Sequence, residues 1–109
     1  MKPTALGDLE LAVLLSVARL GDDAYGGSVR RDVSHRAGHD YSVGAVYVTL
    51  QRLEDKGFVR SWMGEPTPVR GGRARRCFRL TASGAQVLER ARNVRDALWR
   101  GVSPEPRRT

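Results

Sequence analysis

The sequence predicts a mainly α-helical fold with one small β-hairpin. Four segments carry apolar residues at helical spacing, and residues that start or stop helices bound most of them. Two short segments with alternating side chains flank a loop rich in proline and glycine, a pattern typical of a hairpin. A chain of 109 residues is large enough for one domain with a modest core.

The first helix is expected over residues 6–21, and it carries two apolar stripes. One stripe consists of Leu6, Leu9, Val13, Val17 and Leu20, and the other consists of Leu11, Leu14, Leu15 and Ala18. A domain this small is expected to bury one stripe internally and the other against a second subunit. We therefore predict that Leu11, Leu14 and Leu15 lie in a dimer interface. A central core helix of a monomer is the alternative.

A second helix is predicted over residues 24–36, after a short turn. Its glycines make it intrinsically weak. Tyr25, Val29 and Val33 would face inward at positions i, i+4 and i+8. A short connection then leads to the third helix.

The third helix is predicted over residues 42–57, because Ser42 can cap its start and Gly57 can adopt the left-handed conformation that ends it. The face expected to be buried consists of Val43, Val46, Leu50 and Leu53. The outer face consists of Gly44, Ala45, Val48, Gln51, Arg52 and Asp55. It begins small and apolar and continues with an amide and a guanidinium, which suits the major groove of DNA. An ordinary amphipathic core helix is the alternative.

Residues 58–63 and 73–80 predict two strands joined by a turn-rich loop. Basic charge is concentrated here, because residues 60–79 hold six arginines and one acidic residue. The second and third predicted helices, with the short connection between them, form a helix-turn-helix. A hairpin after such a motif is called a wing, and its arginines can follow the sugar-phosphate backbone. The wing arginines predicted to contact DNA are Arg70, Arg73, Arg75 and Arg76.

The last helix is predicted over residues 82–100, with Thr81 as its cap. Its apolar side chains have no further domain to cover them, so we expect them to pair with the first helix of the same or a neighbouring subunit. The interface residues predicted on this helix are Leu88, Ala91, Val94 and Leu98.

We expect a disordered leader at 1–5, a winged helix-turn-helix domain at 6–80, a dimerisation helix at 81–100 and a disordered tail at 101–109.

The formal net charge of +7 favours a polyanionic partner, either nucleic acid or an anionic membrane surface. Acidic residues interrupt the apolar N-terminal segment, so neither a signal peptide nor a membrane span is expected. The single cysteine, Cys77, permits no intramolecular disulfide and suits a reducing interior. We therefore expect a cytoplasmic protein.

Other chemistry has little support in the sequence. His35 and His39 have the spacing of two metal ligands on a helix, but a helix end is expected between them and no cysteine cluster accompanies them. Neighbouring arginines could activate Cys77 as a redox sensor, but the chain offers no resolving thiol. No catalytic constellation is recognisable. We expect no enzyme activity, no metal and no cofactor.

Four segments are informative in their order and spacing: Leu6-Gly7 with the apolar helix that follows, Ala24-Tyr25-Gly26, residues 42–59 and residues 72–84. Together they resemble the PadR family of bacterial transcriptional regulators. The resemblance implies a winged helix-turn-helix repressor that dimerises through its terminal helices and binds a dyad-symmetric promoter site. Because one helix follows the wing, the chain resembles the short-tailed branch of the family.

The resemblance also implies roles for individual residues. Tyr47 should touch a DNA phosphate, and Tyr25 should lie at the DNA backbone with the wing arginines. The start of the third helix should lie over base edges; its residues are Ser42, Val43, Gly44 and Ala45. In some short-tailed relatives an aromatic residue of the last helix lines an effector pocket at the dimer interface. Trp99 has a similar place here, and simple packing in the dimer core is the alternative.

The predicted function is that of a dimeric repressor that reads double-stranded DNA and possesses a site for a small hydrophobic or aromatic effector. Base discrimination would come from Ala45, Val48, Gln51 and Arg52. The alternative is a winged-helix adaptor that binds an acidic protein and no DNA, which Asp55 on the outer face mildly favours.

Overall fold

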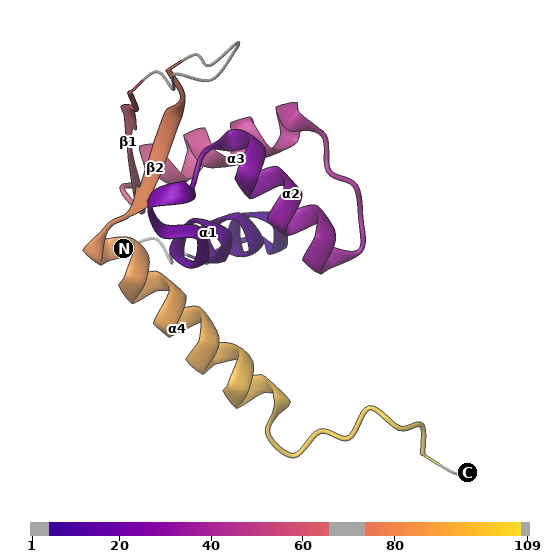
Figure 1. Cartoon of the computed structure of the whole chain (residues 1–109). Coiled ribbons are helices and arrows are strands. Elements are labelled where there is room, and N and C mark those ends of the chain that lie inside the picture. The colour runs from indigo at the N-terminus through magenta and orange to yellow at the C-terminus, as the bar shows by residue number, and fades with distance from the viewer. Residues whose placement is uncertain (1–4, 66–73, 108–109) are drawn as a thin grey trace.

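The structure is a computed structural model that describes residues 5–65 and 74–107. In chain order the elements are α1 (Asp8–Leu20), the 3-10 turn η1 (Gly21–Asp23), α2 (Gly26–Ala37), α3 (Val43–Asp55), β1 (Val59–Met63), β2 (Arg76–Leu80) and α4 (Ala82–Trp99). The predicted fold class is confirmed, because the described residues are mainly helical and contain one antiparallel hairpin (Figure 1).

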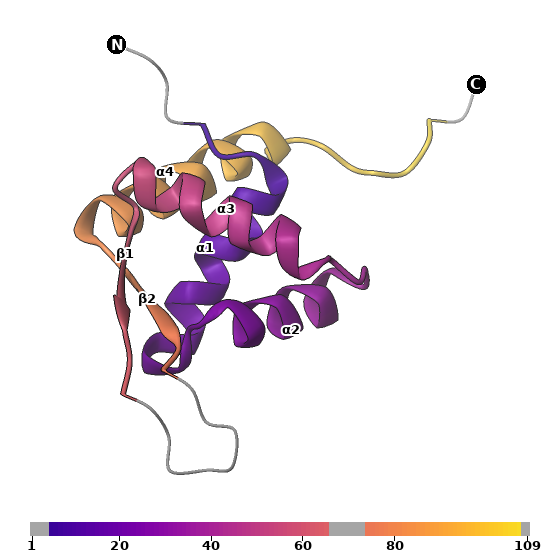
Figure 2. The same ribbon diagram turned by 90° about the horizontal axis from the view of Figure 1, so that it is seen from above.

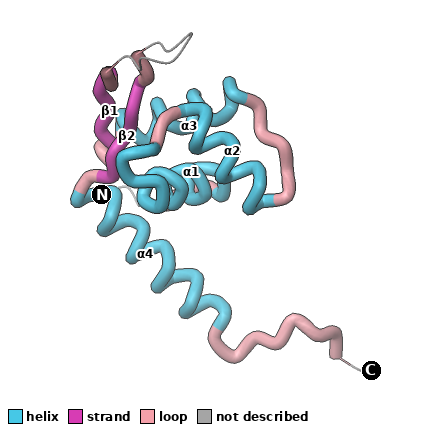
Figure 3. Tube along the Cα trace, in the orientation of Figure 1, coloured by secondary structure: helices cyan, strands magenta, loops and turns pink. Residues whose placement is uncertain are grey.

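Helices α1, α2 and α3 form a body, and the hairpin stands at one side of it (Figures 1 and 2). Helix α4 follows the hairpin and runs away from the body, which gives the chain an elongated shape of 64 × 33 × 20 Å (Figure 3). The hairpin and α4 leave the body in different directions (Figure 1). The surface that carries α3 and the hairpin is therefore separate from most of α4.

The core lies between α1, α2 and α3 and extends under the hairpin. Its buried apolar residues are Val13, Leu14, Val17, Ala24, Val29, Val33, Val46, Leu50, Leu53, Phe58, Val59, Phe78 and Val87. Full burial of a valine, leucine or phenylalanine side chain contributes roughly 1.5–3 kcal/mol to the stability of the fold. Most of these residues come from the helical body, so the body holds α3 and the hairpin in place.

The ends of α3 follow the prediction, whereas one residue of its predicted buried stripe does not. Ser42 Oγ accepts a hydrogen bond from the Ala45 amide at 3.1 Å. Gly57 has φ +82°, the left-handed conformation expected beyond the helix. Val43 was expected to be buried, but 52% of it is exposed, because it is the first residue of α3 and lies between the exposed residues Ser42 and Gly44. Thr49 is buried instead, and its hydroxyl donates to the Ala45 carbonyl at 2.8 Å.

Helix α2 begins two residues later than predicted, because Ala24 and Tyr25 are extended and pair with β2. The Phe78 amide donates to the Ala24 carbonyl at 2.9 Å, and Tyr25 forms an isolated bridge with Cys77. Val29 and Val33 are buried as expected, whereas the prediction that Tyr25 faces inward is wrong: its side chain is only partly buried. The backbone pairing of this short extended segment fixes the hairpin to the start of α2.

The two strands pair in an antiparallel register that places Val59 opposite Leu80 and Ser61 opposite Phe78. Val59 and Phe78 face the core and are buried. The chain enters β1 through Phe58, whose amide donates to the Leu53 carbonyl at 2.9 Å just after α3. The hairpin is thus attached to the body through its buried inner face as well as through the pairing of β2 with Ala24 and Tyr25.

One predicted interface residue of α1 lies in the core. Leu14 is fully buried within the chain and is unavailable to a second subunit, so its assignment to a dimer interface is wrong. The cause is that α2, α3 and β2 all pack against α1 and cover more of it than one stripe. Leu15 remains exposed, and Leu11 is partly buried.

Helix α4 is anchored at its start and exposed further along. Thr81 Oγ1 accepts from the Gly84 amide at 3.0 Å, which confirms the predicted cap. Val87 is buried, whereas Val94, Leu98 and Trp99 are exposed. Among the described residues, no helix combines the length and the apolar character needed to cross a membrane.

Candidate nucleic-acid interface

The outer face of α3 is free of packing within the chain. Gly44, Val48, Gln51 and Asp55 are all exposed and follow helical spacing along one row. Gln51 Nε2 donates to Asp55 Oδ1 at 3.0 Å, so the amide and the acidic residue near the end of the row are hydrogen-bonded to each other. Arg52 is exposed beside this row. The structure therefore presents small and apolar groups first, followed by an amide and a guanidinium, as the sequence predicted.

Tyr47 lies on the flank of α3 that faces the start of α2. Its ring packs against the backbone of Gly26, where a Cβ atom would lie only 2.4 Å from Tyr47 Cζ. The tyrosine nevertheless remains 44% exposed. The ring is thus held from one side by Gly26, while part of the residue stays open to solvent beside the outer row of α3.

Glu54 ties the hairpin to the same flank of α3. Its Oε2 atom accepts from the Ser61 amide at 3.2 Å and from the Ser61 hydroxyl at 2.6 Å. Its Oε1 atom accepts from Arg76 Nη2 at 2.8 Å. Arg76, which was predicted to contact DNA, is exposed, and its ion pair with the Glu54 carboxylate also holds the hairpin to α3.

Tyr25 stands between the hairpin and α2 and gathers two arginines. Arg31 Nη2 donates to the Tyr25 hydroxyl at 2.8 Å. The guanidinium carbon of Arg75 lies 4.3 Å from the centre of the Tyr25 ring, a cation–π contact. Arg75 and Tyr25, which were both predicted to lie at the DNA backbone, are thus side by side. The predicted wing residues Arg70 and Arg73 lie outside the described residues.

Two acidic residues support the helices beneath this surface. Burial alone would raise the pKa of Glu10, but hydrogen bonds from Lys56 and the Gly7 amide, with the positive charges of Lys56 and Arg52, bring that pKa below its ordinary value. The Lys56 ammonium donates to Glu10 Oε2 at 2.7 Å, which links the end of α3 to the start of α1.

Asp32 on α2 links α1 and α2, because it forms ion pairs with Arg19 of α1 and Arg36 of α2. Burial raises its pKa, but hydrogen bonds and ion pairs with Arg19 and Arg36 outweigh this effect and lower the pKa to about 2.

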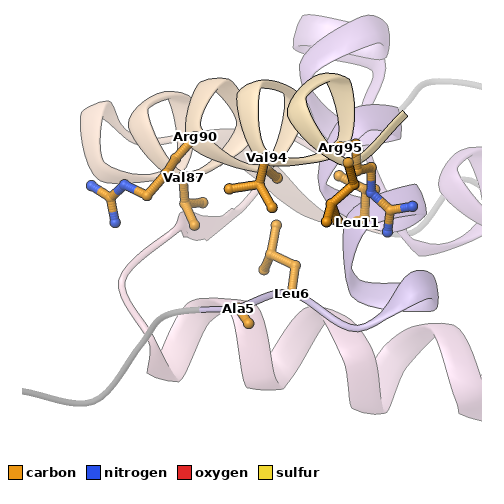
Figure 4. Close-up of a pocket in the computed structure, with 9 residues that line it drawn as sticks. Ala5, Leu6, Leu11, Val87, Arg90, Val94 and Arg95 are labelled. Carbon is orange, nitrogen blue, oxygen red and sulfur yellow. The ribbon is translucent and has the colours of Figure 1, made fainter. Parts of the chain in front are cut away.

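An apolar cavity of about 480 Å³ separates α4 from the start of the chain (Figure 4). Its lining residues are Ala5, Leu6, Leu11, Val87, Arg90, Ala91, Val94, Arg95 and Leu98. The side chains of Leu6 and Val94 point toward one another across it (Figure 4). Arg95 Nη2 donates to Asp8 Oδ1 at 3.1 Å on α1. Trp99, which was predicted to line an effector pocket, is exposed and does not line this cavity.

The residues considered for other chemistry lie apart from each other. His35 and His39 are both exposed, and Gly38 ends α2 between them. The His39 ring packs edge-on against Tyr41 at 4.5 Å. Within residues 5–65 and 74–107, no three His, Cys, Asp or Glu side chains are grouped to hold a metal ion. Cys77 is partly buried on β2, opposite Trp62.

Sequence reasoning missed two residues of this surface, Arg31 and Glu54. Arg31 is one of several arginines on α2, and nothing in its spacing relative to Tyr25 predicts their hydrogen bond. Glu54 follows Leu53 at the end of α3, and its role depends on how the hairpin folds back. The sequence does hold a signal for Glu54, because this acidic residue comes shortly before a strongly basic hairpin; the structure shows that it is partly buried there.

Solved structures of transcription regulators share this fold. A PadR family transcription regulator from Clostridium difficile is 23% identical, with a TM-score of 0.63, over 86% of this chain and 88% of that chain. A Streptococcus transcriptional regulator is 29% identical, with a TM-score of 0.68, over 84% and 85% of the two chains. A PadR-like transcriptional regulator from Bacillus cereus is 18% identical, with a TM-score of 0.68, over 83% and 82%. A comparison with curated protein sequences gave no significant match.

A comparison with models of protein families matches the transcriptional regulator PadR-like family over residues 14–90. The matched region is more than half of the 109 residues and includes α2, α3, the hairpin and the first half of α4. The chain therefore belongs to the PadR-like family, and it is a DNA-binding transcriptional regulator and not an enzyme.

Proposed function

We propose that the protein is a homodimeric transcriptional repressor that binds a dyad-symmetric operator and releases it when a small hydrophobic or aromatic molecule binds at the dimer interface. The observation that supports this proposal best is the exposed outer row of α3 beside Tyr47, Tyr25 and Arg75. In this proposal α3 enters the major groove, and the hairpin follows the flanking backbone. A dimer bound across a promoter would exclude the polymerase from it.

Base contacts are assigned to the start and the outer row of α3. Ser42, Val43, Gly44 and Ala45 would lie over base edges, because small residues permit close approach of the helix. Val48 would contact a thymine methyl, whereas Gln51 and Arg52 would read purines. Tyr47, Tyr25 and Arg75 would bind phosphates, which supply affinity for any sequence.

Dimerisation is assigned to α4 together with Leu11 and Leu15 of α1. Leu98 is 72% exposed and Trp99 is 60% exposed, and a run of exposed apolar side chains on one helix is typical of a contact surface. Leu88, Ala91 and Val94 continue this surface toward the start of α4. An effector would bind in the neighbouring apolar cavity. Because Trp99 does not line that cavity within the chain, it would contact the effector only where two subunits meet.

Selection of bound sites from a random duplex pool tests the proposal. The expected result is an inverted repeat whose half-sites are separated by about one helical turn, about 10 base pairs, or a multiple of it. Gln51→Ala should relax the preference at one position of each half-site without abolishing binding. Recovery of sites without dyad symmetry would contradict the homodimeric mode. Binding to random duplex that is insensitive to salt would favour the adaptor alternative.

Effector binding can be followed by tryptophan fluorescence. The chain has two tryptophans, so Trp62→Phe leaves Trp99 as the reporter. Titration with a panel of small aromatic compounds should quench Trp99 and weaken operator binding over the same concentration range, because the two equilibria are linked. Leu11→Gln would place an amide in the wall of the cavity and should weaken both effects. Quenching without loss of operator affinity would contradict the regulatory role.

A further inference from the structure

Two arginines from distant parts of the chain converge on one tyrosine ring. Arg31, on α2, hydrogen-bonds the Tyr25 hydroxyl at 2.8 Å, and its guanidinium carbon lies 5.8 Å from the ring centre. Arg75, just before β2, stacks on the same ring at 4.3 Å. Tyr25, Arg31 and Arg75 are named the Tyr25 clamp below.

The positive charges of the clamp are not neutralised by nearby acidic residues. Within residues 5–65 and 74–107, neither Arg31 nor Arg75 has a carboxylate within 4.0 Å. In the part of the chain that the structure describes, six other arginines each pair with a carboxylate: Arg19, Arg30, Arg36, Arg76, Arg79 and Arg95. Two unpaired cations held on one ring repel each other, and an anion between them would remove this cost.

The clamp lies next to the surface assigned to DNA. Tyr25 immediately precedes Gly26, whose backbone carries the ring of Tyr47 from α3. At Gly27 a Cβ atom would lie 3.1 Å from Tyr25 Cε2 and 3.4 Å from Arg31 Nη1, so glycine leaves the side of the clamp near α2 uncrowded. A ligand of the clamp would therefore lie beside the outer row of α3, where a backbone strand would border the groove.

We propose that the Tyr25 clamp binds one phosphodiester of the duplex in each half-site, with Tyr25 as a platform that positions Arg31 and Arg75 on the same phosphate. This inference rests on the proposed docking of α3 in the major groove. It adds a binding role for Arg31, and it gives Tyr25 the further role of positioning both arginines at the phosphate.

The chemistry of the groups favours a phosphate over a base edge. A guanidinium is a planar fork of N–H donors that matches two oxygens of a phosphate. Stacking of Arg75 on the ring covers one face of its guanidinium and leaves the in-plane N–H groups for a ligand. Arg31 uses Nη2 on the tyrosine hydroxyl, so its remaining donors stay available. The ring thus orders two flexible side chains before DNA binds, which lowers the entropy cost of binding.

Fluorescence anisotropy with a labelled random-sequence duplex tests the clamp, in the full-length protein at about 0.15 M salt, where the Debye length is about 8 Å. Arg31→Gln and Arg75→Gln should each weaken binding about tenfold. The double variant should also weaken it about tenfold, and not a hundredfold, because either arginine alone holds the shared phosphate poorly. Arg92→Gln and Arg79→Gln remove the same charge elsewhere and should change affinity by less than about twofold.

The platform role is tested with variants that keep both arginines. Tyr25→Leu should weaken binding about as much as loss of one arginine, although the net charge is unchanged. Tyr25→Phe keeps the ring under Arg75 and removes only the acceptor of Arg31, so a loss of about threefold is expected. Thermal melting of each variant shows whether it is folded; if Tyr25→Leu unfolds, Tyr25→Phe decides.

Three results would overturn the clamp. They are unchanged affinity in the double arginine variant, multiplicative losses that indicate two separate phosphates, and unchanged affinity in the folded Tyr25 variants. If the wild-type protein shows no salt-dependent affinity for duplex DNA, the proposed function fails as well. If the wild type binds with a normal salt slope and only the clamp variants behave unexpectedly, the clamp alone is wrong.

Discussion

The backbone of Gly26 lies directly against the ring of Tyr47, and a Cβ atom at residue 26 would be 2.4 Å from Tyr47 Cζ and 2.5 Å from its hydroxyl oxygen. This contact joins the first turn of α2 to the flank of α3. Gly26 directly follows Tyr25, and the position of Tyr47, a proposed phosphate contact, therefore depends on the absence of a side chain on a different helix.

Gly26→Ala should therefore displace the Tyr47 ring. Overpacking of this kind costs typically 1–3 kcal/mol of unfolding free energy, partly offset by the better helix propensity of alanine. We expect a lower melting temperature and weaker binding to random duplex. Adding Tyr47→Ala to Gly26→Ala should recover stability, because the clash is then absent, but it should not recover DNA binding. Equal stability of Gly26→Ala and the wild type would contradict the contact.

Gly44→Ala is the matched substitution on the exposed face of α3 that is proposed to enter the major groove. A Cβ atom at Gly44 would meet nothing within 4 Å in the chain, so alanine should stabilise α3 by up to about 1 kcal/mol. If Gly44 approaches base edges closely, the same change should weaken operator binding several-fold. Denaturant titration and anisotropy on the same samples measure the two effects. A variant that is more stable and binds as well as the wild type would remove Gly44 from the interface.

Substitutions of Leu14 and Leu98 should have different effects, because Leu14 is buried in the core and Leu98 is exposed on α4. Leu14 is fully buried in the core, so Leu14→Ala should lower the unfolding free energy by about 2–5 kcal/mol. This loss should not vary with protein concentration, because no subunit contact is involved. Chemical denaturation at two protein concentrations measures it. A loss below about 1 kcal/mol would contradict the core position of Leu14.

Leu98→Asp should instead disrupt association, because it places a charge on the exposed apolar face of α4 assigned to dimerisation. The expected result is a monomer in sedimentation equilibrium, with the far-ultraviolet circular dichroism of a folded protein. Asn93→Asp adds the same charge to the same helix and serves as the control. If Leu98→Asp remains a dimer, the subunits do not meet through this part of α4.

The stability of the fold should depend on pH through the ionisation of Asp32. Its folded pKa of about 2 is below the ordinary value of 3.8, so its ionised form stabilises the fold above about pH 4, and this contribution is lost as the pH falls from about 4 to 2. Asp32→Asn should cost at most about 2 kcal/mol at neutral pH, because Arg19 and Arg36 are partly exposed. The difference between variant and wild type should shrink toward pH 2 in urea titrations. A difference that stays constant over this range would contradict the ion-pair role.

Much of the fold follows from local features of the sequence. The caps at Ser42 and Thr81 and the glycine beyond α3 act over a few residues, so they mark helix ends without any knowledge of the tertiary structure. The outer row of α3 was predictable for the same reason, because helical periodicity alone decides which residues share a face. The excess of arginine in residues 60–79 is also visible in the sequence, and it indicated a polyanionic partner.

The tertiary structure decided which of these side chains are available. Leu14 lies in the core because three other elements pack around α1. The spacing of apolar residues in a helix does not show how many elements pack against it. Arg76 and Arg75 are neighbours in sequence, yet one pairs with Glu54 on α3 and the other stacks on Tyr25 before α2. Such contacts depend on the path of the chain between distant segments. A local pattern therefore determines what a residue can do, whereas the packing of distant segments determines which partner it meets.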